Sequence, residues 1–450
     1  MKVFVGTIVH STWEEPMNIL QNTALGVHDS EIVFIEAAQR LEDLKTKYSF
    51  IDSDITYLTS SQFMMPGMVD THIHASQFPN NGIKLDLSLL DWLNTYTFPT
   101  EAMFSDVKVA QCVYPKVVER LLKNGTTTAA YYATLHLEAS KVLAQVVHDR
   151  GQRALIGKVN MMVNCPEYYR ESSITESVSE TEDFIFFIKK LQTPLIKPVI
   201  TPRFAVACSL DQMKQLGQLA KKHDCHIQTH LCETQAEVTW IQELFPWSKS
   251  YTDVYDTAGL LGAKTIMAHC VWIEEQELKR LKECNTGVAH CPNSNISIRS
   301  GHCDVRQLIC RGIKVGLATD CSGGYSSSML DSLRRALDVS KSLSIQRQNY
   351  QFLTLPEVFR LATLGGAQVV NMEDRIGNFE IGKEFDSLLI DFEVPRSPLD
   401  IFDKDTLEDK IHKFLYNGDD RNIVQVYVAG RCVINNKNCY HSCELLQPQY

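Results

Sequence analysis

From residue 66 onward, short apolar runs alternate with amphipathic segments, and this alternation constrains the fold more than any other feature of the chain. Repeated strand–helix units predict a parallel sheet, because a crossover helix must return the chain to the end of the sheet where the previous strand began. The runs that read as strands lie at residues 68–74, 126–132, 153–159, 195–201, 226–231, 265–270, 286–291 and 313–320.

Helix-like segments separate these strands. The segment 106–123 carries its apolar residues on one face and is followed by Gly125, and the segment 209–223 begins at Ser209, a residue type that caps helix N-termini. Further helices are predicted near 138–150, 175–191, 234–245, 253–261, 274–283, 304–311 and 328–345. Eight strands, each followed by a helix, predict an α/β fold with a (β/α)8 TIM-like barrel. An open doubly wound sheet is the competing architecture, but no G-x-G-x-x-G motif follows the first strand.

Both ends of the chain read as strands and turns. Residues 1–66 contain short apolar runs interrupted by a charge-rich helical piece at 37–48, and strand-like runs return at 385–390 and 423–428 after a helix near 356–370. A few short strands do not form a stable sheet alone, so we expect the two ends to combine in one small β-sandwich domain. The predicted domains are 1–66 and 375–450, which form the small β domain, and 67–374, which form the barrel.

Charge and cysteine usage exclude several classes of protein. The chain has 44 basic and 54 acidic residues, a net charge of −10, which argues against a nucleic-acid binder. No run of 18 apolar residues and no signal-peptide pattern occurs, so we expect no membrane association. There is no C-x-x-C pair, and the spacing of Cys439 and Cys443 does not favour a zinc knuckle. Scattered cysteines predict reduced, buried thiols in a cytoplasmic protein, including Cys225, Cys270, Cys291 and Cys310.

The strongest chemical signal ends the first predicted barrel strand, where residues 69–74 read Val-Asp-Thr-His-Ile-His. Side chains alternate along a strand, so His72 and His74 point the same way. In a barrel that direction is the interior, and active sites lie where the strands end. Two polar core residues would be the alternative explanation for an isolated H-x-H.

Recurrence at other strand ends argues against that alternative. The fifth strand ends at His230, the sixth at His269 and the eighth at Asp320. Together with His72 and His74, His230 and Asp320 offer nitrogen and oxygen ligands that suit Zn²⁺ with a position left for water. Ligand type alone leaves Fe²⁺ and Mn²⁺ open.

Three further side chains lie near these strand ends. Glu233 follows His230 by three residues and is placed to shuttle protons without binding the metal, although an exposed glutamate opening the next helix would read the same way. His269 is either a ligand or a group that orients the water, and we favour the second role. His290, at the end of the seventh strand, either holds its loop or touches the substrate.

These motifs resemble the amidohydrolase superfamily, and within it the branch that deaminates guanine. The resemblance covers nearly the whole chain. The histidine and aspartate signature marks the superfamily, whereas Gln77, Arg203-Phe204 and the glycine-tyrosine loop after Asp320 mark the branch. Its motifs here are Pro-Gly-Met-Val-Asp-Thr-His-Ile-His at 66–74, His-Ala-Ser-Gln at 74–77, Thr-Pro-Arg-Phe at 201–204, His-Cys-Pro-Asn-Ser-Asn at 290–295, Gly-Gly-Tyr-Ser at 323–326 and Gly-Asp-Asp-Arg-Asn-Ile at 418–423.

The resemblance implies a zinc-dependent hydrolysis of guanine to xanthine and ammonia, with one Zn²⁺ per subunit held by His72, His74, His230 and Asp320. It implies that Glu233, Asp320 and His269 are catalytic. Asp320 would take a proton from water, Glu233 would protonate a ring nitrogen, and His269 would donate to the attacking oxygen. The implied substrate-binding residues are His74, Ala75, Ser76, Gln77, Arg203, Phe204, His230, Glu233 and Asp320.

For the substrate, Arg203 offers a planar fork that matches the O6/N7 edge of guanine, and Phe204 would stack on the purine. A salt bridge across the barrel rim is the alternative role for Arg203. Lys158 and Lys197 are conceivable sites for the carboxylated lysine of two-metal relatives, but the deaminase pattern uses none, so a core-rim or ion-pair role is expected for both.

Two other functions remain open from the sequence. An amidohydrolase acting on a different heterocycle, as a deaminase or chlorohydrolase, would share the metal residues, and a non-catalytic scaffold would keep only the barrel. The resemblance implies a homodimer. Whether Tyr325 contacts the base, and whether Trp92 lines the pocket mouth or packs an inserted helix, is not fixed by the sequence.

Overall fold

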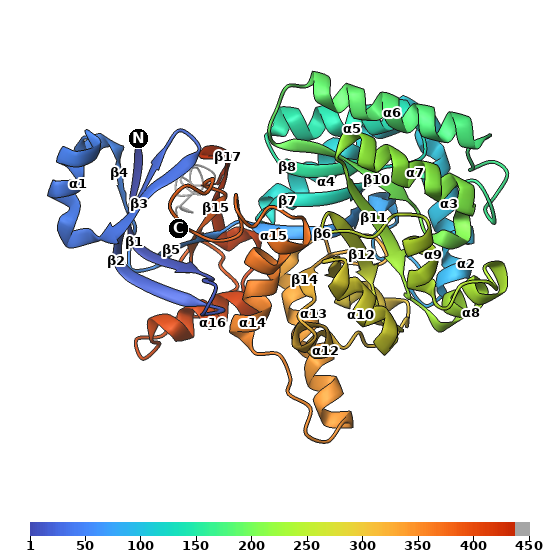
Figure 1. Ribbon diagram of the computed structural model, residues 1–450. Coiled ribbons are helices and arrows are strands. Elements are labelled where there is room, and N and C mark those ends of the chain that lie inside the picture. The colour runs from blue at the N-terminus through green and yellow to red at the C-terminus, as the bar shows by residue number, and fades with distance from the viewer. Residues whose placement is uncertain (437–450) are drawn as a thin grey trace, which may run out of the picture.

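A computed structural model describes residues 1–436, and the Cys439/Cys443 pair therefore lies outside the described residues. The chain forms a barrel and a separate sheet beside it (Figure 1). The barrel strands run in the order β14-β13-β12-β11-β10-β8-β7-β6, and each strand pairs in parallel with its neighbours in this order. Their bounds are β6 Met68–His74, β7 Thr126–Tyr132, β8 Arg153–Gly157, β10 Ile196–Pro202, β11 His226–Leu231, β12 Thr265–His269, β13 Gly287–His290 and β14 Lys314–Leu317, with the short β9 (Val159–Asn160) pairing β10.

Helices surround the barrel strands, as the alternation predicted. Helix α4 ends before Gly125, whose φ of +80° is a left-handed conformation that glycine adopts freely, and Ser209 caps α7 through its side chain. The helices of this part are α4 Val107–Lys123, α5 Leu137–Arg150, α6 Ile174–Lys190, α7 Leu210–His223, α8 Gln235–Leu244, α9 Tyr251–Thr257, α10 Glu275–Glu283, α11 Pro292–Ser297, α12 Val305–Cys310, α13 Met329–Gln346, α14 Leu355–Arg360 and α15 Gly366–Val369. An insert between β6 and α4 adds α2 Leu89–Trp92, a π-helical turn Leu93–Thr97 and α3 Phe98–Ala102.

The barrel closes between its first and last strands through backbone groups of three predicted metal ligands and of Cys321. The backbone N–H of Asp320 donates to the His72 carbonyl at 2.9 Å, and the N–H of His74 donates to the Cys321 carbonyl at 3.0 Å. Asp70 reinforces this seam, because its carboxylate accepts from the Thr319 hydroxyl at 2.6 Å and from the Thr319 N–H at 3.0 Å. The predicted (β/α)8 barrel is confirmed.

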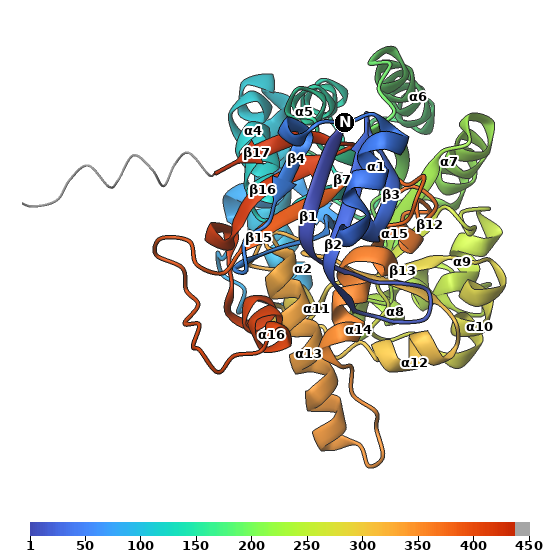
Figure 2. The same cartoon turned by 90° about the vertical axis from the view of Figure 1, so that its left-hand side faces the viewer.

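The two chain ends share one sheet, which faces the viewer in Figure 2. Its order is β17-β16-β15-β5-β1-β2-β3, and the pairing of β15 with β5 joins the C-terminal strands to the N-terminal ones. Shared formation of the small β domain by both chain ends is thus confirmed, whereas the domain limits stay a prediction. The strands are β1 Lys2–His10, β2 Asn18–His28, β3 Glu31–Ala37, β4 Ile55–Tyr57, β5 Gln62–Pro66, β15 Ser387–Asp391, β16 Ile423–Val428 and β17 Arg431–Asn435, with helices α1 Leu41–Tyr48 and α16 Leu407–Asn417.

A buried ion pair fastens this sheet to the barrel. Arg153, at the start of β8, is 0% exposed and donates two hydrogen bonds to Asp386, each of 2.9 Å, and one of 2.7 Å to Glu384. The Asp386 backbone carbonyl also accepts from the N–H of Gly67, just before β6. The segment that leads into β15 is therefore held against two barrel strands.

The cysteine predictions can be compared with burial. Cys225, Cys270 and Cys291 are buried, as predicted, whereas the prediction for Cys310 is wrong because α12 presents it to solvent.

Within residues 1–436, the helices are too short or too polar to cross a membrane.

Candidate active site

Three imidazoles and one carboxylate converge where the barrel strands end. His72 and His74 leave β6 on the same side, His230 comes from β11, and Asp320 follows β14. Nε2 of His74 lies 3.2 Å from Nε2 of His230, and Asp320 Oδ1 lies 3.2 Å from Nε2 of His72 and 3.6 Å from Nε2 of His74. The structure thus brings together all four residues that were predicted to hold a metal.

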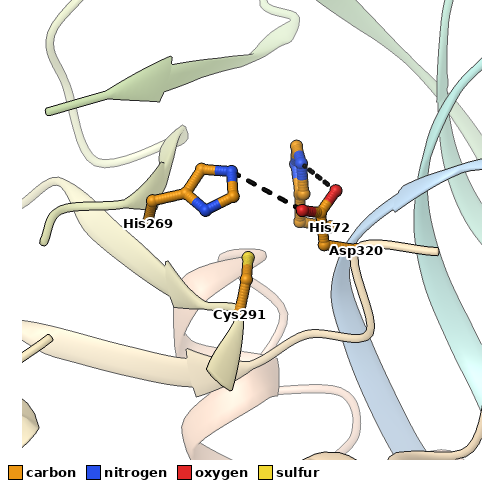
Figure 3. A group of neighbouring side chains, drawn as sticks. All are labelled: His72, His269, Cys291 and Asp320. Carbon is orange, nitrogen blue, oxygen red and sulfur yellow. Dashed lines mark ion pairs between the residues drawn. The ribbon is translucent and has the colours of Figure 1, made fainter. Parts of the chain in front are cut away.

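A second, overlapping group shares two of these residues. His72, His269, Cys291 and Asp320 offer ligand atoms within 4.8 Å of one another (Figure 3), and His269 Nε2 lies 3.8 Å from Asp320 Oδ2. Sequence reasoning treated Cys291 only as a buried thiol. Burial raises the pKa of this thiol well above its usual value, and Sγ contacts the Ala289 carbonyl at 3.4 Å. The four residues predicted as ligands already supply imidazole nitrogens and a carboxylate without Cys291.

Contacts at Nδ1 orient the imidazole rings of His230 and His269. Nδ1 of His230 donates to the Arg203 carbonyl at 2.6 Å, and Nδ1 of His269 faces the Asn295 amide oxygen at 2.9 Å. Each Nε2 is thereby directed at the cluster, which is how backbone and amide oxygens orient metal-binding histidines. Asn295 has this supporting role without having been predicted.

The protonation states suit a cation. Burial, followed by the neighbouring His72, lowers the pKa of His230 well below its usual value, and burial also lowers the pKa of His74. For Asp320, burial opposes the charged form, but the neighbouring His72 and His269 together outweigh burial and lower the pKa to about 2. The His72 Nε2 atom is buried and has no hydrogen-bond partner among the described residues. Neutral imidazoles beside an ionised carboxylate fit a divalent metal ion, and zinc is typical of this donor set.

Glu233 lies at the edge of the cluster, three residues after His230. Its carboxylate accepts from the Ser300 hydroxyl at 3.3 Å and lies 3.6 Å from His269 Nε2, and its backbone N–H donates to Glu237 at 3.0 Å. Burial raises the pKa of Glu233 to about 7. A carboxyl group that titrates near neutral pH can both take and give a proton in water.

The pKa of His269 is shifted in the opposite direction from the pKa values of His72, His74 and His230. Burial disfavours its charged form, but the carboxylates of Glu233 and Asp320 outweigh burial and raise its pKa. Its Nε2 lies 3.6 Å from Glu233 Oε2 and 3.8 Å from Asp320 Oδ2, so the ring faces both carboxylates. This favours the orienting role over the ligand role for His269.

A cavity opens onto the cluster, and most of the predicted substrate-binding residues line it. Ala75 and Ser76 are buried in the turn after β6 but do not line the cavity, and the Ser76 hydroxyl donates to the Ala133 carbonyl instead. The apolar wall supplied by the insert and by Ile298 was not predicted. The lining residues are His74, Gln77, Leu89, Trp92, Leu93, Arg203, Phe204, His230, Glu233, His269, Ile298, Asp320 and Gly323.

Arg203 combines the two roles that the sequence left open. It lines the cavity and also forms an ion pair, in which Nη1 lies 2.6 Å from a carboxylate oxygen of Glu101. Gln77 donates to the other oxygen of Glu101 at 2.9 Å. Sequence reasoning missed Glu101, because it lies in the insert and follows no strand.

The residues with open roles divide between the cavity wall and the core. Trp92 lines the cavity and is also buried in the insert, where its indole N–H donates to the Ile83 carbonyl at 3.0 Å. Tyr325 is 44% exposed and does not line the cavity. His290 is buried away from it, and burial lowers its pKa to about 3. Lys158 forms a buried ion pair with Glu171 at 2.5 Å, as expected of a carboxylate partner.

Known proteins share both the fold and the sequence. Residues 63–433 match the model of the amidohydrolase family. The chain is 49% identical over 439 residues to guanine deaminase of Mus musculus, covering 96% of each chain. It is also similar to the crystal structure of a guanine deaminase from C. acetobutylicum with guanine bound in the active site, with 35% identity, a TM-score of 0.88, and coverage of 96% of this chain and 99% of that one. The guanine deaminase of E. coli has 31% identity and a TM-score of 0.86, with coverage of 97% and 100%.

Proposed function

Because this chain belongs to the amidohydrolase family, we propose that it catalyses the hydrolytic deamination of guanine to xanthine and ammonia. One observation carries the proposal: His74, His230 and Asp320 of the convergent cluster line a single cavity together with the buried Glu233 and with Arg203. The guanine deaminases that it resembles match 96% of the chain, which favours guanine over other heterocycles.

We further propose one zinc ion per subunit, held by His72, His74, His230 and Asp320. Zinc supplies Lewis-acid activation of a water molecule, whose pKa such ions lower from about 15.7 to about 7. The Nε2 atoms of His74 and His230 lie 3.2 Å apart, and the pKa of Asp320 beside them is lowered to about 2, which supports this ligand set.

The chain's own residues then move protons and hold the base. Asp320, being ionised, accepts a proton from the attacking water, and Glu233 protonates a ring nitrogen of the purine. His269 donates a hydrogen bond to the oxygen that adds to C2. The proton held by Asp320 then passes to the C2 amine, which leaves as ammonia. The hydroxyl group at C2 returns its proton to Glu233, and its oxygen remains as the C2 carbonyl of xanthine.

The other lining residues orient guanine so that C2 faces the metal. Arg203 donates to the carbonyl side of the base, Phe204 packs on its face, and Gln77 bonds its edge. Adenine has an amine where guanine has O6, so the buried donors of Arg203 would go unpaired. Such mismatches reduce specificity constants by about 10⁴-fold or more.

The assembly and location proposed with this activity are a cytoplasmic homodimer that acts on a small molecule and binds neither nucleic acid nor membrane. The net charge of −10 supports the absence of a nucleic-acid partner. The metal and activity proposals are tested together by measuring zinc content and ammonia release from guanine on the same purified sample. A zinc-free or inactive protein, or one that prefers another purine or a pteridine in a substrate panel, contradicts them.

A further inference from the structure

We propose that Glu101 is a positioning residue that sets the hydrogen-bonding polarity of the substrate pocket through Gln77 and Arg203. This inference rests on the proposed function. It assigns the choice of purine to a carboxylate that does not itself line the cavity.

The position of Glu101 is unusual for an acidic side chain. It lies on α3, in the insert between β6 and α4, and it is 0% exposed. A buried carboxylate is costly unless it is paired and hydrogen-bonded. Glu101 meets both conditions with two partners that line the cavity, since Oε2 accepts from Arg203 Nη1 at 2.6 Å and Oε1 accepts from Gln77 Nε2 at 2.9 Å.

Glu101 determines which way the Gln77 amide faces. An ionised carboxylate only accepts hydrogen bonds, so the amide nitrogen of Gln77 must be the atom turned toward it. The amide oxygen, to which no group of the described residues donates, is then the atom left for a ligand. Without the carboxylate, the amide could rotate and present its nitrogen in place of its oxygen.

The same carboxylate restrains the arginine. Glu101 holds one end of the Arg203 guanidinium, and the ring of Phe98, on the same short helix α3, lies 5.2 Å from the guanidinium carbon. Glu101 and Phe98 thereby restrain the guanidinium group from two sides. Its remaining N–H groups form no hydrogen bond with the described residues. They are free to donate to an acceptor in the cavity.

The pocket therefore presents an acceptor from Gln77 and donors from Arg203. This pattern complements a purine that carries a ring N–H beside a carbonyl oxygen, as guanine does at N1 and O6. 2-Aminopurine keeps the C2 amine but has neither group. The ratio of kcat/KM for guanine to kcat/KM for 2-aminopurine consequently measures how strongly the pocket prefers a base that carries N1–H and O6.

The test is the Glu101→Gln variant of the zinc-loaded enzyme, assayed by ammonia release from both bases. An amide at position 101 can donate as well as accept, so Gln77 loses its fixed orientation and Arg203 loses its counter-charge. We expect the ratio to fall by about tenfold or more, mainly through guanine, while kcat/KM for 2-aminopurine changes less than about threefold. Glu101→Asp, which keeps the charge, should recover part of the ratio.

Glu171→Gln is the matched control, because Glu171 is also a buried carboxylate paired with a cation, Lys158, but does not line the cavity or contact its polar residues. An unchanged ratio in Glu101→Gln, or an equal fall in Glu171→Gln, overturns the inference. If the wild-type enzyme does not release ammonia from guanine, the proposed function fails as well.

A second measurement avoids dependence on a variant that fails to fold. In a crystal structure of the zinc-loaded wild-type enzyme with guanine, Glu101 should still bind both Arg203 and Gln77, and the Gln77 oxygen should face a ring N–H. Release of Arg203 from Glu101 on binding, or an inverted amide, contradicts the inference.

Discussion

Replacing Glu233 by glutamine removes the proposed proton donor but largely keeps the size and the hydrogen bonds of the side chain. The amide is almost the same size, and its oxygen can still accept from the Ser300 hydroxyl, which lies 3.3 Å from the carboxylate in the wild type. The bond from the Glu233 N–H to Glu237 is a backbone contact and survives. The predicted ligands are untouched, so zinc content should remain at the wild-type level.

The expected loss follows from the proton transfers that Glu233 carries. General acid–base groups contribute about 10²- to 10⁴-fold to rate, which is about 2.7 to 5.4 kcal/mol of barrier at 1.36 kcal/mol per tenfold. Burial raises the pKa of Glu233 from 4.5 to about 7. As the acid that protonates the ring it must start protonated, so wild-type kcat/KM should fall as pH rises through about 7, and Glu233→Gln should lack this limb.

The assay is ammonia release from guanine across pH 5.5 to 9 (roughly the range that brackets the expected transition), with zinc measured on each sample. Glu243→Gln, at an exposed position of α8, controls for the loss of a carboxylate. A Glu233→Gln enzyme with the full wild-type rate would refute the proton-shuttle role. Loss of zinc together with the rate would instead make Glu233 a ligand.

Three further outcomes are expected. Removing the metal with a chelator should abolish ammonia release, and added Zn²⁺ should restore it, as followed by activity and metal content; activity that survives complete removal would contradict the metal proposal. Arg153→Met leaves the buried Asp386 carboxylate unpaired and should lower the free energy of unfolding by about 3 kcal/mol or more in urea titrations, whereas an unchanged midpoint would mean that the pair adds nothing. Burial lowers the pKa of His226 from 6.5 to about 4, so unfolding takes up a proton between these values and the free energy of unfolding falls as pH falls through this window. His226→Gln should reduce that slope by about 1.4 kcal/mol per pH unit, and equal slopes would contradict it.

The barrel and the convergence of the four residues proposed as ligands could be predicted because both depend on local periodicity. Residues 126–132 and 226–231 were predicted with the bounds that β7 and β11 have. The shared direction of His72 and His74 follows from strand geometry, because one residue, Ile73, separates them. Convergence with His230 and Asp320 then follows from the closure of eight strands.

Other elements were missed for two different reasons. Helix α16 was predicted as part of a strand-rich region, although Ile411, Phe414 and Leu415 have helical spacing and Thr406 forms a capping box with Asp409. That signal was present and overlooked. Glu101 had no comparable signal, since its partners Gln77 and Arg203 lie 24 and 102 residues away along the chain.

The hydrogen bonds that close the barrel affect when the site can form during synthesis of the chain. The first barrel strand, with His72 and His74, is synthesised long before its hydrogen-bond partners Asp320 and Cys321. The Thr71 hydroxyl on the same strand, for example, donates to the Leu317 carbonyl, which lies 246 residues later in the chain. A nascent chain that has reached residue 310 holds every ligating imidazole but neither the aspartate nor the backbone groups that lock the last strand to the first. We therefore expect the proposed ligand set to be complete only after the eighth strand has been synthesised, since every shorter chain lacks one of the four ligands.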